Sequence, residues 1–270
     1  LDVPVDASVG ATVELDGPWL APAVRASVGI TELVAAEIPL GGAQLKISGE
    51  VGKRLEIVAE EFLPHFTLDS AELRFDGGLP DRLDASLSFA SLSPAQILAD
   101  FPEVVSARAT GTAVLAVRFQ DGEAFTAAVD LPANKLESCL NSDALSICMQ
   151  NPAPSQIIVG TSGVRFRATH LVGGGHSLNV QGGLDYRAGW DMSVGASLDV
   201  ARVPFLGEWL ASYEGRVGTG KEPLVISGPL DNPEIRGSVQ VANIDLMPRQ
   251  LGSEITIPHG IFQVGGSLME

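Results

Sequence analysis

The feature that most constrains this 270-residue sequence is a phrase that occurs twice. Residues 228–241 read GPLDNPEIRGSVQV and residues 17–28 read GPWLAPAVRASV, with six identities in twelve aligned positions. Glycine and proline favour a tight turn, and alternating polar and apolar residues then indicate a strand with two different faces. Residues 37–45 and 256–264 share a second phrase, with isoleucine, proline, glycine and glutamine in common. Recurrence of this kind predicts a repeat array.

Alternation with a period of two dominates the rest of the chain. Pairs of apolar residues flank one polar or small residue, recur about every 8–15 residues, and are separated by turn-forming Gly, Asp and Pro. We interpret the glycines of residues 182–183, 218–220 and 265–266 as turns of this kind. The pattern predicts an all-β protein of mostly antiparallel hairpins with about 18–20 strands. The pairs are Leu45 and Ile47, Leu73 and Phe75, Leu87 and Phe89, Val117 and Phe119, Val164 and Phe166, Leu178 and Val180, Leu184 and Tyr186, Met192 and Val194, Leu198 and Val200, Val239 and Val241, Ile255 and Ile257, and Phe262 and Val264.

Helices are expected to be few and short. Ser93 as the N-cap and Pro94 as the first helical residue predict a helix over residues 93–101. Weaker patterns predict helices at residues 204–212 and 135–140. Helices of about nine residues are not stable alone. We therefore expect them to cap an open edge or end of the sheet.

The segment 133–156 is polar and contains both cysteines, Cys139 and Cys148. We interpret it as an insertion or join between a first β-section, residues 1–132, and a second, residues 157–270. The cysteines either form a disulfide, which would stabilise the fold by about 2–3 kcal/mol, or remain free thiols. We favour the disulfide. The segment has neither a CxxC spacing nor a neighbouring histidine, so we do not expect a metal site there.

The net charge of −16 excludes some partner classes. An acidic surface repels the phosphates of nucleic acids and anionic membrane surfaces, so we expect no nucleic-acid partner. Hydrophobic residues make up 45% of the chain, and the charge is expected to keep it soluble. The sequence begins at Leu1 without an initiator Met or signal peptide and has no apolar run near eighteen residues. We expect it to be a segment of a longer protein.

Motifs for catalysis are not evident, and we predict neither enzyme activity nor a cofactor. The sequence has no HExxH and no GxSxG, and its four histidines stand in unrelated contexts typical of turns or strands. Residues 215–221, GRVGTGK, fit part of a phosphate-binding loop. That loop requires Ser or Thr next and then a helix, whereas Glu222, Pro223 and a predicted strand follow. We expect a turn there rather than a nucleotide site.

Three motifs between residues 213 and 264 carry a family resemblance. They are the opening EGRV at 214–217, an alternating core with GPxxxP at 224–241, and a following hairpin at 255–264. This pattern resembles the repeat region of the TamB/AsmA-like proteins of the Gram-negative cell envelope. Residues 17–45 echo it, and 92–117 are similar to the family's spacer of a short helix and a strand. Residues 133–156 depart from it.

The resemblance implies an elongated, twisted sheet curled lengthwise into an open groove, a β-taco. Family members are bridge-like lipid transfer proteins of the periplasm. They pass phospholipid from the inner toward the outer membrane, and some work with an outer-membrane barrel of the Omp85 type. By this resemblance the partner here is the phospholipid acyl chain, and an inner-membrane anchor is expected outside this segment. The twelve apolar pairs given above then become candidates for the lining of a lipid groove.

The residue pattern by itself leaves two interpretations open. The candidate positions are mostly aliphatic, which suits acyl chains, and each buried CH₂ would contribute about 0.8 kcal/mol. The same alternation also serves a structural or protein-binding β-solenoid or sandwich, whose apolar face is an ordinary core. A hydrolase would need a nucleophile or an acid–base pair, and the sequence shows neither.

Overall fold

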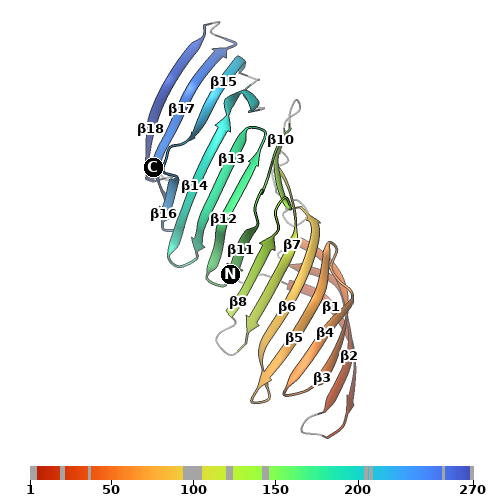
Figure 1. The fold of residues 1–270 in the computed structure, drawn as a ribbon. Coiled ribbons are helices and arrows are strands. Elements are labelled where there is room, and N and C mark those ends of the chain that lie inside the picture. The colour runs from red at the N-terminus through yellow and green to blue at the C-terminus, as the bar shows by residue number, and fades with distance from the viewer. Residues whose placement is uncertain are drawn as a thin grey trace. The chain divides into compact units, whose positions relative to one another are not determined.

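The computed structural model describes residues 5–18, 22–35, 38–93, 105–119, 124–141, 146–203, 206, 209–250 and 253–267. Contacts divide the chain into two compact units. The first unit comprises residues 1–101 and 109–130, and the second comprises residues 102–108 and 131–270. Strands β1–β8 lie wholly or mostly in the first unit and β9–β18 lie in the second; Figure 1 labels all of them except β9.

The first unit is an antiparallel meander in which each strand pairs with the next one along the chain. Its strands are β1 (Val5–Asp16), β2 (Ala23–Ala35), β3 (Ile38–Glu50), β4 (Arg54–Glu61), β5 (Phe66–Asp76), β6 (Leu79–Leu92), β7 (Val105–Arg118) and β8 (Ala124–Leu131).

The second unit is also antiparallel, but one of its strands is interrupted. Strand β14 pairs with both β15 and β16, and these two pair in turn with β17. Its elements are β9 (Leu136–Asn141), β10 (Ser146–Gln150), β11 (Ser155–Gly160), β12 (Gly163–Gly173), β13 (His176–Asp185), β14 (Gly189–Asp199), the 3₁₀ helix η2 (Val200–Arg202), β15 (Leu210–Thr219), β16 (Leu224–Gly228), β17 (Glu234–Pro248) and β18 (Ile255–Ser267).

The prediction of an all-β, mostly antiparallel protein is confirmed, with 18 strands and no α-helix in the described part of the chain. One predicted helix is wrong, and a second is contradicted only at its end, because residues 204–205 and 207–208 lie outside the described residues. Residues 136–140 belong to β9, which pairs with β10, and the end of the 204–212 prediction belongs to β15. At residues 136–140 and 210–212, strand pairing outweighs a short apolar pattern with helical spacing. The predicted helix at 93–101 lies, beyond Ser93, outside the described residues.

Three of the predicted glycine turns are also wrong. Gly182 and Gly183 lie inside β13, residues 218–219 lie inside β15, and Gly265 lies inside β18. A Cβ at Gly182 would stand 2.1 Å from the carbonyl oxygen of Asp191 on the neighbouring strand. The backbone at Gly182 also has φ of +98°, which glycine adopts without strain. Here glycine permits close strand contact within the sheet instead of a change of direction.

Bulges interrupt several long strands without exchanging their faces. Glu32, Ser91, Ala168 and Asn243 have φ between 44° and 55°, and each lies at a shift of strand register. In β12, for example, Phe166 and Thr169 are three residues apart but pair with residues of β13 that are two apart. The extra residue keeps both side chains on one face and bends the strand.

The internal repeat is visible in the structure. Gly17 and Gly228 have φ of 96° and 100°, and the bulge residues Glu32 and Asn243 have φ of 55° and 51°. Both pairs are 211 residues apart (17 to 228 and 32 to 243). The second phrase is shifted, because Val28 pairs with Leu45 whereas its equivalent, Val239, pairs with Phe262. The repeat is therefore a structural unit of hairpin and bulge, with a two-residue difference between the copies.

A single asparagine organises the segment that we interpreted as an insertion or join. Asn151 is fully buried. Its side-chain oxygen accepts hydrogen bonds from the backbone N–H groups of Lys135 (3.0 Å) and Leu136 (2.8 Å). Its amide nitrogen donates to the carbonyl oxygens of Pro132 (2.8 Å) and Ala153 (3.0 Å). These bonds hold the turn before β9 against the residues that follow β10.

We expect Asn151→Ala to destabilise the second unit by about 3–4 kcal/mol, because several buried backbone groups lose their partner at once. The measurement is the urea midpoint of unfolding followed by circular dichroism. Asn179→Ala is the matched control, since Asn179 is an exposed residue of β13 and should change the midpoint little. Equal midpoints for the two variants would contradict the role assigned to Asn151.

Candidate functional site

The first unit carries an unbroken apolar face. One row of directly paired residues crosses all eight strands and consists of Leu15, Val24, Gly49, Leu55, Leu73, Leu83, Val117 and Phe125. The next row on the same face consists of Val13, Ala26, Ile47, Ile57, Ala71, Ala85, Leu115 and Ala127. Because side chains alternate between faces, these two rows lie on one side of the sheet. We call this side the first apolar face.

The second unit carries a similar face. One row runs through Ile157, Phe166, Gly182, Met192, Ile226 and Ile235. Another runs through Leu198, Val217, Val241 and Gly260. Beyond the bulge of β17, Ile244 pairs with Ile257 and Leu246 pairs with Ile255. We call this side the second apolar face.

All but three of the groove candidates lie on these two faces. Phe119 lies in a bend after β7, Tyr186 lies in a turn after β13, and Val200 lies in η2, so their expected places in strands are wrong. The sequence reasoning also missed other apolar members of these rows, such as Val24 and Ile57. Their alternation is present in the sequence, but alanines and glycines in the same rows weaken the apolar signal.

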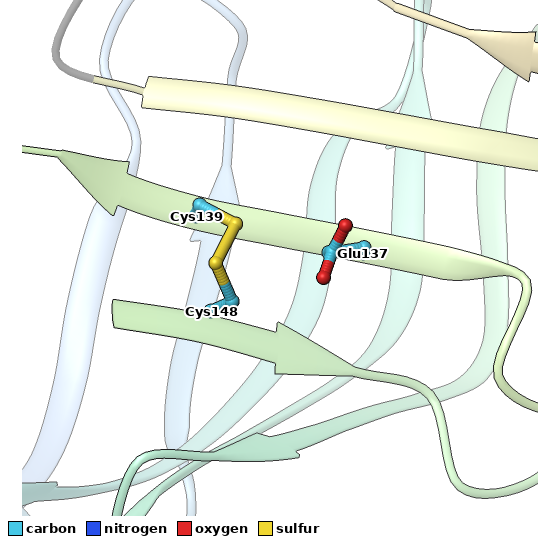
Figure 2. A group of neighbouring side chains, drawn as sticks. All are labelled: Glu137, Cys139 and Cys148. Atoms are coloured by element: carbon cyan, nitrogen blue, oxygen red, sulfur yellow. A yellow bond between two sulfur atoms is a disulfide. The ribbon is translucent and has the colours of Figure 1, made fainter. Parts of the chain in front are cut away.

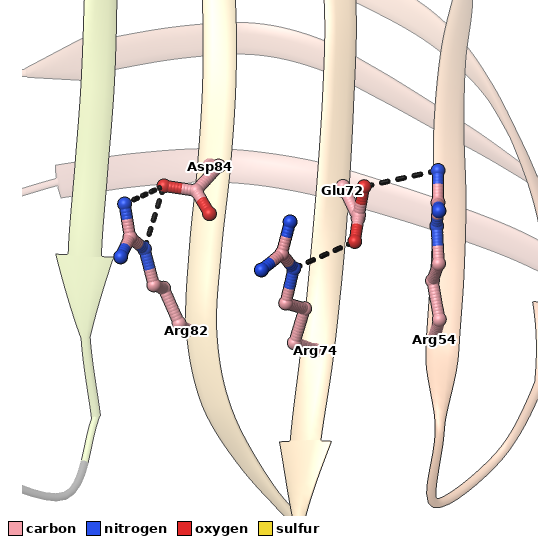
Figure 3. A network of polar contacts seen from close by, with 5 residues as sticks. All are labelled: Arg54, Glu72, Arg74, Arg82 and Asp84. Carbon is pink, nitrogen blue, oxygen red and sulfur yellow. Dashed lines mark hydrogen bonds and ion pairs between the residues drawn. The ribbon is translucent and has the colours of Figure 1, made fainter.

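The opposite face of the first unit is polar and charged. Arg54, Arg74 and Arg82 are direct neighbours across β4, β5 and β6, which places like charges opposite one another. Glu72 compensates by binding Arg54 (3.0 Å) and Arg74 (2.7 Å), and Asp84 binds Arg82 (2.7 Å). Glu72 also raises the pKa of Arg74 above its ordinary value through a hydrogen bond and its charge. Figure 3 shows these side chains on the near side of the strands, while pale red N-terminal strands cross on the far side.

The two apolar faces are only partly covered. On the first face Val9 and Leu15 of β1 are more than 60% exposed, and most buried positions are small, such as Ala43, Ala71 and Ala113. The chain exposes 16874 Å² to solvent. Two compact globular proteins of half this mass would together expose roughly 13,500 Å². The excess agrees with sheets that keep much of one apolar side uncovered.

One region of the second face is an ordinary core. Val200 of η2 packs with Val241 and Ile244, and Leu206 and Tyr213 pack against this cluster. Val200 and Val241 are 7% and 8% exposed, so neither side chain is accessible to a ligand in this structure. We therefore separate these two groove candidates from the more open positions of the same face.

The second face also contains buried polar atoms without a partner. They are Ser155 Oγ, Thr169 Oγ1 and His176 Nε2. His176 is 5% exposed, and its Nδ1 accepts a hydrogen bond from the N–H of Asp199 (3.2 Å). Burial lowers the pKa of His176, and Arg202 lowers it further, whereas the charge of Asp199 opposes the shift. The imidazole is therefore neutral at pH 7, as its burial at the start of β13 requires.

A hollow of about 320 Å³ lies beside the bulge of β17. Asp199, Glu214 and Asp245 line it together with Arg216. Residues 215–219 of the sequence that partly fits a phosphate-binding loop belong to β15, and β16 follows after a short break. β15 and β16 both pair with β14 on one side and with β17 on the other, and they run in the same direction. The break between them is therefore an interruption of one strand rather than the expected hairpin turn. The acidic lining disfavours phosphate.

The two cysteines are joined in a disulfide across β9 and β10, where they are direct register partners. Figure 2 shows Glu137 beside this disulfide. Its carboxylate and the two sulfur atoms lie within 4.8 Å of one another. Because the sulfur atoms are bonded to each other, neither offers a thiolate to a metal ion. We derive no metal site from this group.

Comparisons of the chain with protein-family models, with characterised proteins and with solved structures gave no match. Within the described part of the chain, no helix has the length and apolarity needed to cross a membrane. We therefore infer function from the two apolar faces and from the resemblance in the sequence.

We expect the stability of the second unit to decrease as pH falls through about 6.5, the ordinary pKa of histidine. Because the pKa of folded His176 is lowered, the unfolded chain binds a proton in this range that the folded chain does not. His176→Gln should reduce the difference between urea midpoints measured at pH 8 and pH 5.5. His259→Gln, at an exposed position of β18, should retain it. An unchanged pH dependence in His176→Gln would contradict the prediction.

Proposed function

We propose that this chain is a section of a lipid-transfer protein whose apolar faces shield phospholipid acyl chains from water. The observation that carries the proposal is the register of apolar residues across neighbouring strands, from β1 to β8 in the first unit. An acyl chain that moves across such strands stays in contact with apolar side chains at every step. No polar anchor or chemical step is required.

The composition of the faces supports acyl chains as the ligand. Their members are mainly Val, Leu, Ile and Ala, and burial of each lipid CH₂ contributes about 0.8 kcal/mol. The small residues of the first face, such as Ala71, Ala85 and Ala127, occupy the middle rows. Bulges bend the strands, and side chains converge on the inner side of a bend, so small residues leave space there. This arrangement favours an open groove.

The resemblance to TamB/AsmA-like proteins extends the proposal to the setting. We infer a periplasmic location, with transfer between inner and outer membranes in support of outer-membrane assembly. The disulfide between Cys139 and Cys148 supports an oxidising compartment. An Omp85-type barrel is the partner that the resemblance suggests, and a membrane anchor would be supplied outside this segment.

We expect a photo-crosslinking residue to distinguish the second apolar face from the opposite side of the same sheet. Phe166 lies on the second apolar face, and its neighbour Arg165 is an exposed residue of the other face. Benzoylphenylalanine at position 166 should crosslink to phospholipid in cells or in vesicle mixtures, because its excited ketone inserts into nearby C–H bonds. The same group at position 165 should give little lipid adduct. The readout is the mass of the intact protein, and equal adduct formation at both positions would contradict the proposal.

We expect Val239→Asp to reduce transfer of a fluorescent phospholipid between vesicles at least tenfold, because a carboxylate interrupts the apolar path. Gln240→Asp is the control with the same new charge on the opposite face. Both variants should keep urea midpoints near that of the unmodified chain. If Val239→Asp unfolds while Gln240→Asp does not, Val239 is part of a closed core, and the structural β-module becomes the better interpretation.

A further inference from the structure

The second apolar face changes from open to closed along the length of its strands. Every member of the row from Ile157 to Ile235 is half-buried. On β17, Val239 is also half-buried, whereas Val241 and Ile244 are only 8% and 4% exposed. Val239 and Val241 are successive residues of one face, because side chains alternate along a strand. The change therefore falls within a single step of β17.

The 3₁₀ helix η2 is the element that closes the face. It directly follows β14, and its Val200 packs with Val241 and Ile244. Gly215 of β15 leaves room for this contact, because a Cβ at that position would stand 2.7 Å from Cδ1 of Ile244. The side chain of Ile244 thus lies close over the backbone of β15. Val200 is an aliphatic side chain of the chain itself that is seated on the apolar face.

Hydrogen bonds hold η2 in this place. The N–H of Asp199 donates to Nδ1 of His176 (3.2 Å), and Oδ1 of Asp199 accepts a hydrogen bond from the N–H of Ala201 (3.2 Å). The N–H of Val203 donates to the carbonyl oxygen of Val200 (3.1 Å). Val200 therefore lies between backbone groups that are tied on both sides, so its side chain has a fixed place beside β17.

We propose that Val200 is the boundary of the lipid path on the second apolar face. Acyl chains occupy the open side of the face, from the row of Ile157 to Ile235 as far as Val239, and Val200 keeps them from Val241 and Ile244. Its side chain makes the dispersion contacts that a lipid methylene would otherwise make there. This inference rests on the proposed function and adds the residue that limits the width of the path.

The test maps the positions at which acyl chains contact the full chain. Vesicles of a phosphatidylcholine that carries a diazirine at the end of one acyl chain are mixed with the protein and irradiated, and tandem mass spectrometry of its peptides locates the adducts. We expect adducts on the open side, for example at Met192, Ile226 and Val239. Adducts at Val241 and Ile244 should be roughly tenfold fewer, because close-packed side chains leave no space for lipid.

Three variants test the role of Val200 itself. Val200→Ala leaves a cavity beside Val241 and should raise the adducts at Val241 and Ile244 by roughly threefold or more. Val200→Ile keeps a branched aliphatic side chain and should give the map of the unmodified chain. Val172→Ala is the matched control, since it removes the same two methyl groups from an exposed residue on the opposite face of β12. A urea midpoint accompanies each map.

The outcomes separate this inference from the proposed function. Adducts at Val241 or Ile244 of the unmodified chain that are as frequent as those at Val239 overturn the boundary but leave lipid binding in place. A folded Val200→Ala variant with an unchanged map also overturns it. Adducts on no part of the face overturn both proposals. If Val200→Ala unfolds, the maps of the unmodified chain and of Val200→Ile decide, because neither shortens the side chain.

Discussion

Cross-strand register is the constraint on which the rest of this structure depends. Side chains alternate with a period of two, so a slip of one residue between neighbouring strands would place every apolar residue on the wrong face. In the first unit the row from Leu15 to Phe125 crosses eight strands without a polar residue. Each hairpin therefore has to maintain the register that the previous one set. Bulges at Glu32, Ser91 and Asn243 absorb extra residues without exchanging the faces.

The polar and the apolar sides of the sheets have different energetic roles. On the polar face of the first unit, the row of arginines would be unfavourable alone, and the half-buried carboxylates of Glu72 and Asp84 offset it by pairing with the exposed arginine side chains. Such pairs add little to stability, and the charge chiefly keeps a sheet with an exposed apolar side in solution. The apolar faces bury less of their area than a sandwich core would. A ligand or a partner that covered them would add hydrophobic stabilisation that the sheet alone does not have.

The sequence correctly placed most of the groove candidates on one side of each sheet, because Val, Leu, Ile and Phe at alternate positions are a direct signal of a two-faced strand. It failed where small residues carry the pattern, as at Ala26 and Ala71, and where glycine serves close strand contact, as at Gly182. It also failed at residues 136–140, because a short apolar spacing fits a helix as well as a strand and only the pairing with β10 decides between them. The importance of Asn151 could not be predicted, since its partners are contributed by residues up to twenty positions away.

By itself the sequence determined the fold class, the two-faced character of the strands, and the recurrence of the hairpin that begins at Gly17 and again at Gly228. These are local properties, because alternation and turn chemistry are written within about fifteen residues. Only the tertiary structure decided which apolar residues share a row, where bulges rephase the alternation, and that Val200 closes one part of the second face while Phe262 remains open. Those outcomes depend on hydrogen bonds between strands, and the identity of a strand's neighbour is not encoded in the strand's own alternation.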